Sequence, residues 1–339
     1  MSGQADRVLL CAGRWWKNRR ARAALGCVYT HVYHVRTITA RHATKVQRHS
    51  KVFTKIQALR LPYRQLVALD IDLVIMSDLS PLFDVDAPAG TYHGEWGNYL
   101  EHGQAISDSV GGGHWWCVNA GVMRLDPPVC SRARRQHVDV MIEEVQRIDF
   151  PTNLPEQYFL AERMAGWRHI DPSWNYEVGP QYADPGFTWP RSSAIKTATT
   201  FRGSLWHMQR VEAVHVFHFS GTLLHPWWYV DMTPEKAYKE VAAQWYYRDP
   251  KRMLATAVRE WVSALNEVQA MSAYWPKSER NCFEAALEEL RLRSSAHRWA
   301  RYCAPGRTSK CYWCRGYFFA TEGRWLTGWE GWWICFDCV

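Results

Sequence analysis

Residues 66–72 read Leu-Val-Ala-Leu-Asp-Ile-Asp, an apolar run that leads directly into the aspartates Asp70 and Asp72. The run is typical of a buried strand. In an extended chain, side chains two residues apart point to the same face, so the two carboxylates are expected to converge. Open α/β sheets bind ligands just outside the carboxyl ends of their strands. Paired carboxylates at that position suit a hard divalent cation such as Mg²⁺ or Mn²⁺.

The bare Asp-x-Asp pattern is weak, because the chain contains it twice. The second copy, Asp84-Val85-Asp86, follows Pro81-Leu82-Phe83 and is interpreted as a solvated turn. Only the first copy ends a strand-like run. Context therefore favours a metal site at Asp70 and Asp72, with a structural cap of the strand as the alternative.

Hydrophobic periodicity predicts strands alternating with helices along much of the chain. Expected helices cover about residues 52–61, 138–148, 155–165, 234–270 and 278–300, and expected strands cover 91–95, 117–123 and 214–219. This alternation predicts an α/β fold, with a mixed or parallel sheet and helices on both faces. At 339 residues and 47% hydrophobic composition, the chain can build one large domain with extensions, and a disordered chain is excluded.

Charge is concentrated at the amino-terminal end. Residues 1–60 carry 13 Lys or Arg and one acid, and one tight cluster contains Arg14, Lys17, Arg19, Arg20 and Arg22. Three interpretations remain open: an arm for an acidic surface, an organelle-targeting segment, or a solvated helix face. No run reaches the ~20 apolar residues of a membrane span. These features favour a soluble intracellular protein, with organelle targeting as an alternative.

Five sequence blocks follow one another between about residues 51 and 230. They are Phe53-Thr54-Lys55-Ile56 with Tyr63 and the Asp70–Asp72 pair; Met76-Ser77-Asp78-Leu79-Ser80-Pro81-Leu82-Phe83; Asn119-Ala120-Gly121-Val122; Glu156-Gln157 with Leu160; and His218-Phe219-Ser220-Gly221 with Pro226-Trp227. In this order they resemble glycosyltransferase family 8, the glycogenin and galactinol synthase group.

The resemblance implies a GT-A fold, which is a single Rossmann-like domain that binds a nucleotide sugar at its strand ends. It implies metal-dependent, retaining transfer of a hexose from a UDP-sugar to a hydroxyl of a glycan, polyol or protein. Residues 1–232 would form this domain, residues 233–300 a helical extension, and residues 301–339 a separate tail.

The resemblance also implies a role for each matching residue. Asp70, Asp72 and His218 would hold Mn²⁺ or Mg²⁺. Glu156 and Gln157 would lie near the anomeric carbon as the catalytic pair. The residues implied in donor binding are Lys55, Asn119, Gly121, Gly221 and His225.

Three departures from the family pattern qualify these expectations. Glu156 stands where the family usually has aspartate. His225 replaces a lysine that contacts the diphosphate, and neutral imidazole is a weaker phosphate partner. In the amino-terminal region, residues 8–13 and 28–33 are interpreted as diverged strands, or else the nucleotide pocket is incomplete. The alternative function is a catalytically degenerate protein that binds glycan or nucleotide.

The carboxyl-terminal tail carries a separate signal. Two Cys-x-x-Cys pairs, Cys311 with Cys314 and Cys335 with Cys338, have the spacing of a structural Zn²⁺ site in a small ribbon. Two disulfides, redox pairs, and Cys303 as a substitute ligand remain alternatives. The tail would recruit a protein partner, bind glycan or cap the enzyme. Its net charge of +2 does not favour nucleic acid.

Overall fold

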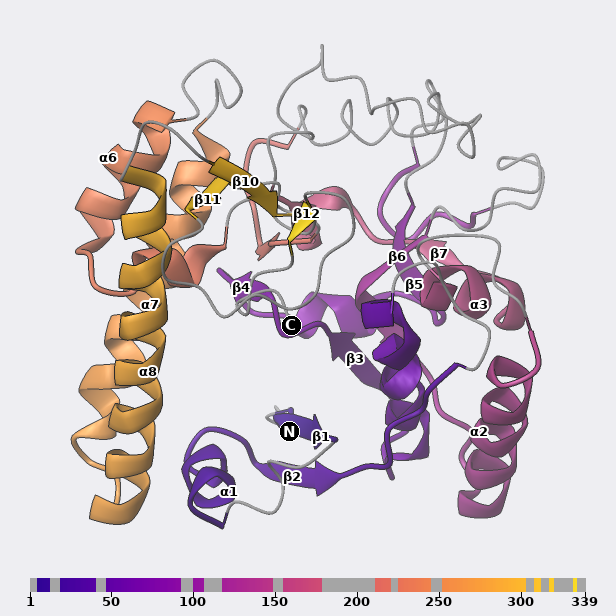
Figure 1. The fold of residues 1–339 in the computed structure, drawn as a ribbon. Coiled ribbons are helices and arrows are strands. Elements are labelled where there is room, and N and C mark those ends of the chain that lie inside the picture. Colours follow the sequence, from indigo (N-terminus) through magenta and orange to yellow (C-terminus); the bar gives the residue numbers. More distant parts are fainter. Residues whose placement is uncertain are drawn as a thin grey trace. The chain divides into compact units, whose positions relative to one another are not determined.

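A computed structural model describes residues 5–12, 19–40, 47–92, 100–106, 118–148, 155–178, 211–220, 225–244, 252–302, 308–311, 317–319 and 332–333 (Figure 1). The chain forms two compact units. The first contains Met1–Glu177 and Pro185–His218, and the second contains Val178–Asp184 and Phe219–Val339. The α/β class predicted from the sequence is confirmed by the sheets and helices of the first unit.

The first unit begins with a parallel strand–helix–strand element. Strand β1 (Val8–Cys11) pairs with β2 (His31–His34), and helix α1 (Arg19–Gly26) lies between them in the sequence. Parallel neighbours need such a crossover connection. The two expected amino-terminal strands are therefore confirmed, the second beginning three residues later than expected. Three arginines of the basic cluster lie in α1.

Two small mixed sheets form the centre of the first unit. In one, the order is β3 (Leu66–Leu69), β6 (Val118–Leu125), β5 (Ala89–Tyr92) and β7 (Arg168–His169), and only the β5–β7 pair is parallel.

In the other sheet, the order is β4 (Leu73–Ile75), β9 (Val216–His218) and β8 (Tyr176–Glu177), with β4 antiparallel and β8 parallel to β9. Because β3 and β4 belong to different sheets, the three residues 70–72 connect one sheet to the other.

Helices contribute to the hydrophobic core that packs against the first sheet. A 3₁₀ helix, η2 (Gln47–Arg60), supplies Phe53, Ile56 and Leu59 to the core, and α2 (Ser131–Val145) and α3 (Pro155–Arg163) complete it. Burying each such side chain contributes ~1.5–3 kcal/mol relative to leaving it exposed. The expected helices are confirmed, although the one before β3 is a 3₁₀ helix. The short 3₁₀ helices η3 (Ser80–Asp84) and η5 (Pro172–Trp174) follow β4 and β7.

The second unit is mainly helical. It contains η6 (Pro226–Tyr229), α6 (Pro234–Gln244), α7 (Met253–Ser272) and α8 (Lys277–Tyr302). The Ser294 hydroxyl of α8 donates to the Trp228 carbonyl at 2.6 Å, which ties α8 to η6. The expected helices are confirmed over the residues described here. None of the described helices is both long and apolar enough to cross a membrane.

The tail contributes a three-stranded sheet to the second unit. Strand β10 (Thr308–Cys311) lies between β11 (Tyr317–Phe319), which is antiparallel to it, and β12 (Trp332–Trp333), which is parallel to it. Of the four cysteines predicted to hold zinc, Cys311 ends β10, and Cys314, Cys335 and Cys338 lie outside the described residues. The alternative ligand Cys303 also lies outside them.

Candidate metal and donor site

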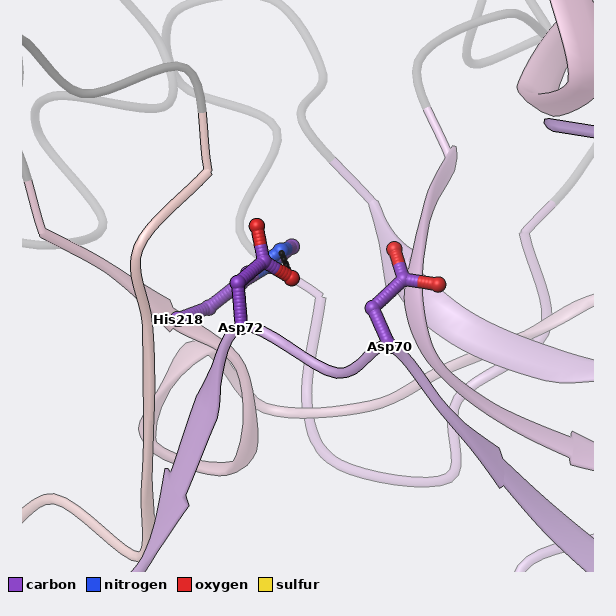
Figure 2. Close-up of side chains that lie close together, drawn as sticks. All are labelled: Asp70, Asp72 and His218. Atoms are coloured by element: carbon purple, nitrogen blue, oxygen red, sulfur yellow. Dashed lines mark ion pairs between the residues drawn. The ribbon is translucent and has the colours of Figure 1, made fainter. Parts of the chain in front are cut away.

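Two distant segments bring together the three predicted metal ligands. Asp70 and Asp72 lie on the link between β3 and β4, and His218 ends β9, where it stands opposite Leu73 of β4. Each of the three side chains offers a ligand atom, and these atoms lie within 4.8 Å of one another (Figure 2). Two carboxylates and one imidazole suit Mn²⁺ or Mg²⁺, and three protein ligands leave positions for phosphate oxygens. The residues present therefore fit a divalent cation.

The two carboxylates converge for a reason other than strand alternation. Strand β3 ends at Leu69, and residues 70–72 form a bend rather than an extended segment. The backbone N–H of Asp70 donates to the Gly121 carbonyl at 2.9 Å, which anchors the start of the bend. Ile71, between the aspartates, is 93% exposed. Figure 2 shows Asp70 and Asp72 at the two ends of this link, with both carboxylates on the same side of it.

His218 is almost fully buried and contacts a neighbour through each ring nitrogen. Its Nε2 atom lies 3.4 Å from Oδ1 of Asp72, and its Nδ1 atom lies 2.8 Å from Oδ1 of Asn175. Burial lowers the pKa of His218, but Asp72 and the more distant carboxylates together raise it above the ordinary histidine value. For Asp72 the effects have the opposite sign. Burial raises its pKa, but its hydrogen bond to His218 brings the pKa below the usual range.

Gly121 provides the space that His218 occupies. A Cβ atom at position 121 would lie 2.2 Å from Cε1 and 2.5 Å from Nδ1 of His218, and 2.9 Å from Oδ1 of Asn119. The requirement for glycine here comes from this close approach, since the backbone is not left-handed. The sequence prediction placed Gly121 beside the donor sugar, and the described geometry places it beside the imidazole.

Lys55 contacts both the Asp–Asp–His cluster and the predicted catalytic pair. Its Nζ atom is 2.8 Å from Oδ1 of Asp70 and 3.8 Å from Oε1 of Glu156, and it donates to the Ala120 carbonyl at 3.2 Å. Burial lowers the pKa of Lys55, but Asp70 and Glu156 raise it above its ordinary value. Burial raises the pKa of Glu156, and the charge of Lys55 opposes that shift only partly.

Replacing Lys55 by methionine should destabilise the first unit. The change keeps most of the side-chain volume but leaves the Asp70 and Glu156 carboxylates without their shared cation. Uncompensated buried charges of this kind cost on the order of 1–3 kcal/mol. Urea unfolding of Lys55→Met should show this loss, and Lys239→Met, at an exposed lysine of α6, should match the parent. Equal stability of the two variants would contradict the prediction.

The remaining predicted residues of the first unit lie next to this cluster. Oε1 of Gln157 accepts from the Ala120 backbone N–H at 3.3 Å. The Asn119 amide is held by protein groups: its Nδ2 donates to Glu177 at 2.8 Å, and its Oδ1 accepts from Gly121 N and from Asn175 Nδ2. The sequence reasoning missed Asn175 and Glu177. Neither belongs to a recognisable motif. Glu177 ends β8 and stands opposite His218 of β9, and Asn175 directly precedes β8.

The resemblance also implies Gly221 and His225 in donor binding. Gly221 lies outside the described residues. His225 belongs to the second unit, where its ring stacks on Trp227 with centroids 4.5 Å apart and meets Trp228 edge to face at 4.8 Å.

Comparisons with known proteins give distant likenesses. No family model matches the chain. An uncharacterized protein, R707, of Acanthamoeba polyphaga mimivirus is 24% identical over 232 residues, which are 66% of this chain and 71% of the relative.

Two of the similar solved structures are glycosyltransferases. One is the galactosyltransferase LgtC in complex with donor and acceptor sugar analogues, at 15% identity and TM-score 0.40, covering 67% of this chain and 80% of that one. The other is the apo-form glycosyltransferase GlyE of Streptococcus pneumoniae TIGR4, at 14% identity and TM-score 0.38, covering 77% of this chain and 64% of that one.

Proposed function

We propose that the chain is a divalent-metal-dependent glycosyltransferase of the GT-A kind, related to family 8, that transfers a hexose from a UDP-sugar with retention of configuration. The observation that carries this proposal is the joining of His218 to the Asp70–Asp72 pair. The two segments are far apart in the sequence, yet their ligand atoms lie within 4.8 Å. The Asp-x-Asp pair alone is a weak motif. With a buried imidazole beside it, the three side chains form a more specific set of ligands for a cation.

Each residue of the cluster has a distinct part in the proposed reaction. Asp70, Asp72 and His218 would hold Mn²⁺ or Mg²⁺, which supplies charge stabilisation for the departing nucleotide diphosphate. Lys55 lies beside Asp70 and adds fixed positive charge at the same place. Glu156 and Gln157 are assigned as the catalytic pair near the anomeric carbon, and their contacts with Lys55 and with the Ala120 backbone support this role. The residues assigned to donor binding are Lys55, Asn119, Gly121, Gly221 and His225.

The nucleoside is assigned to the amino-terminal strand–helix–strand element. Parallel strands β1 and β2 with their crossover helix form the unit that binds mononucleotides at its carboxyl-terminal edge in many α/β proteins. This element supports a nucleotide site in the chain. The transferase domain is taken to extend over residues 1–232, followed by the helical extension at 233–300. The acceptor is a hydroxyl of a glycan, polyol or protein.

The first test is the release of UDP from a panel of UDP-sugars. Metal-stripped protein should be silent, Mn²⁺ or Mg²⁺ should restore release, and one sugar should be preferred. Restoring Zn²⁺ alone separates this site from the tail, because the tail would take zinc and the Asp–Asp–His cluster needs a hard cation for phosphate oxygens. Folded, metal-loaded protein that releases no UDP from any donor would refute the transferase proposal.

The second candidate function is a binding protein that has lost transfer activity. The observation in its favour is His225, which replaces the lysine of the family 8 pattern and whose ring stacks on Trp227. A folded protein that binds UDP with Mn²⁺ at about 100 times its Kd gains ~2.7 kcal/mol of stability. A rise in melting temperature with UDP, together with silence in the release assay, would select this second function.

We also propose one structural zinc ion held by Cys311, Cys314, Cys335 and Cys338. Pairs of cysteines three apart place two thiolates on one turn, and a tail of about 39 residues is too short to be stable without such a crosslink. Elemental analysis of freshly purified, reduced protein should find one zinc per chain, and the Cys335→Ser variant should lose it. A zinc-free parent protein would remove this proposal, and with it the tail as a zinc-dependent site for a protein partner.

A further inference from the structure

We infer that Asn119 and Asn175 form a hydrogen-bond relay that sets the tautomer of His218, so that its Nε2 atom is the one available to a cation. The relay deepens the proposed metal site and rests on that proposal for its purpose. The geometry of the relay does not depend on the proposed function, because the relay starts from a backbone N–H group, which can only donate.

The relay begins at the backbone N–H of Gly121. This group can only donate, and it lies 2.7 Å from the Asn119 side chain, so the atom of Asn119 that faces it is the carbonyl oxygen Oδ1. The other end of the same amide, Nδ2, then faces Glu177 Oε1 at 2.8 Å, where a donor is required. Both contacts agree on one orientation of the Asn119 amide.

The orientation of Asn119 determines that of Asn175. The Asn119 oxygen also lies 2.9 Å from the Asn175 side chain, so the Asn175 atom at this contact must be the donor Nδ2. The Asn175 oxygen therefore faces Nδ1 of His218 at 2.8 Å and can only accept. His218 must carry a proton on Nδ1 to satisfy this contact. The Asp72 carboxylate faces Nε2 at 3.4 Å and competes for the proton of the neutral ring. The shorter contact of Nδ1 with Asn175, at 2.8 Å, favours the Nδ1–H tautomer, which leaves the lone pair on Nε2.

The remaining ring nitrogen lies on the cation side of the cluster. Nε2 of His218 is 3.4 Å from Oδ1 of Asp72, within the group of ligand atoms that includes Asp70. Metal-bound histidines commonly donate their other N–H to a neighbouring acceptor, which fixes ring orientation and tautomer. Asn175 is the neighbouring acceptor in this protein, and Asn119 fixes the orientation of Asn175.

Burial makes the relay rigid and assigns Asn119 a positioning role. Asn119 is 5% exposed, Asn175 is fully buried and Glu177 is 2% exposed. The amide groups of Asn119 are already engaged with Glu177, Gly121 and Asn175. Asn119 and Asn175 are therefore positioning residues that act on the cation through His218.

Nitrogen-15 NMR of the metal-free protein tests the relay directly. Histidine-labelled protein, at a pH above the titration of His218, should show this ring with its proton on Nδ1. The signal is assigned by its loss in His218→Gln. In Asn175→Leu the acceptor is gone, and the ring should become a mixture of tautomers or change to the Nε2–H form. A parent ring protonated on Nε2, or an Asn175→Leu ring unchanged from the parent, would overturn the relay.

A second variant keeps the test decisive if Asn175→Leu does not fold. Asn175→Asp retains an acceptor toward Nδ1, so the Nδ1–H tautomer should persist, and an Nε2–H ring in this variant would contradict the relay. Gln57→Leu is the matched control. Gln57 is also a buried amide, and it bonds the Arg36 carbonyl at 3.1 Å, outside the relay. Its His218 signal should equal that of the parent.

Metal affinity separates the relay from the proposed function. Mn²⁺ titration followed by electron paramagnetic resonance should show affinity lowered about 10–100-fold in Asn175→Leu and unchanged in Gln57→Leu. Equal affinity in both variants would remove the positioning role. Parent protein that binds no Mn²⁺ would refute the metal site alone, and the tautomer measurement would still decide whether the relay exists.

Discussion

Asp72→Asn is expected to lower metal-dependent release of UDP by at least about 100-fold. The carboxylate of Asp72 supplies one of two negative charges in the cluster and is the partner of His218. A neutral amide of the same size coordinates a hard cation less well. The cation's charge stabilisation amounts to several kcal/mol, and each 1.4 kcal/mol corresponds to a factor of ten in rate. Steady-state UDP release at saturating donor measures the effect.

The second Asp-x-Asp of the chain provides the matched control. Asp86→Asn makes the same chemical change at a side chain that is 80% exposed, and it removes the charge of the 3.5 Å ion pair with Arg168. Exposed ion pairs of this kind contribute ~0–1 kcal/mol, so activity and stability should remain close to the parent. Comparable UDP release from Asp72→Asn and Asp86→Asn would mean that Asp72 has no part in catalysis.

Gly121→Ala should damage the site through a single added methyl group. The new Cβ atom would meet the His218 ring at 2.2 and 2.5 Å, distances that the buried ring cannot accept without moving. Overpacking in a closed site costs ~1–3 kcal/mol of stability. A displaced imidazole should also weaken Mn²⁺ binding on the order of 10–100-fold. Urea unfolding and Mn²⁺ titration of the same variant measure the two effects.

Gly26→Ala is the control for this substitution. No atom lies within 4 Å of a Cβ atom at position 26, and Gly26 is the last residue of helix α1. Alanine is favoured over glycine in helices by up to ~1 kcal/mol, so stability should stay the same or rise slightly. Unchanged Mn²⁺ affinity in Gly121→Ala would show that His218 adjusts freely, and the space argument would fail.

The amino-terminal region illustrates how far periodicity alone reaches. Residues 8–13 and 28–33 were expected to be strands, and β1 and β2 lie there as a parallel pair. The pairing of β4 with β9 could not be predicted in the same way. It joins residues 73–75 to 216–218, and no local signal in either short strand specifies a partner so far along the chain.

The candidate site shows the same division. The two aspartates were predicted to converge through strand alternation, and they converge through a bend between two sheets. The convergence of the two aspartates was therefore predicted correctly, but the predicted cause, strand alternation, was wrong. Asn175 and Glu177 were not predicted at all, because hydrogen bonding to His218 and Asn119 depends on the pairing of β8 beside β9.

The α/β class, the helices that supply the core and the Asp70–Asp72 pair are predictable from the sequence, because local periodicity and a short motif carry them within a few residues. His218 joins that pair at the sequence level only through the resemblance to family 8. The fold in three dimensions was needed to see that Gly121 makes room for the imidazole, that Lys55 bridges Asp70 and Glu156, and that Asn119 bonds Glu177. Close approach and hydrogen-bond direction depend on pairings between distant segments, and the order of residues along each segment does not contain these pairings.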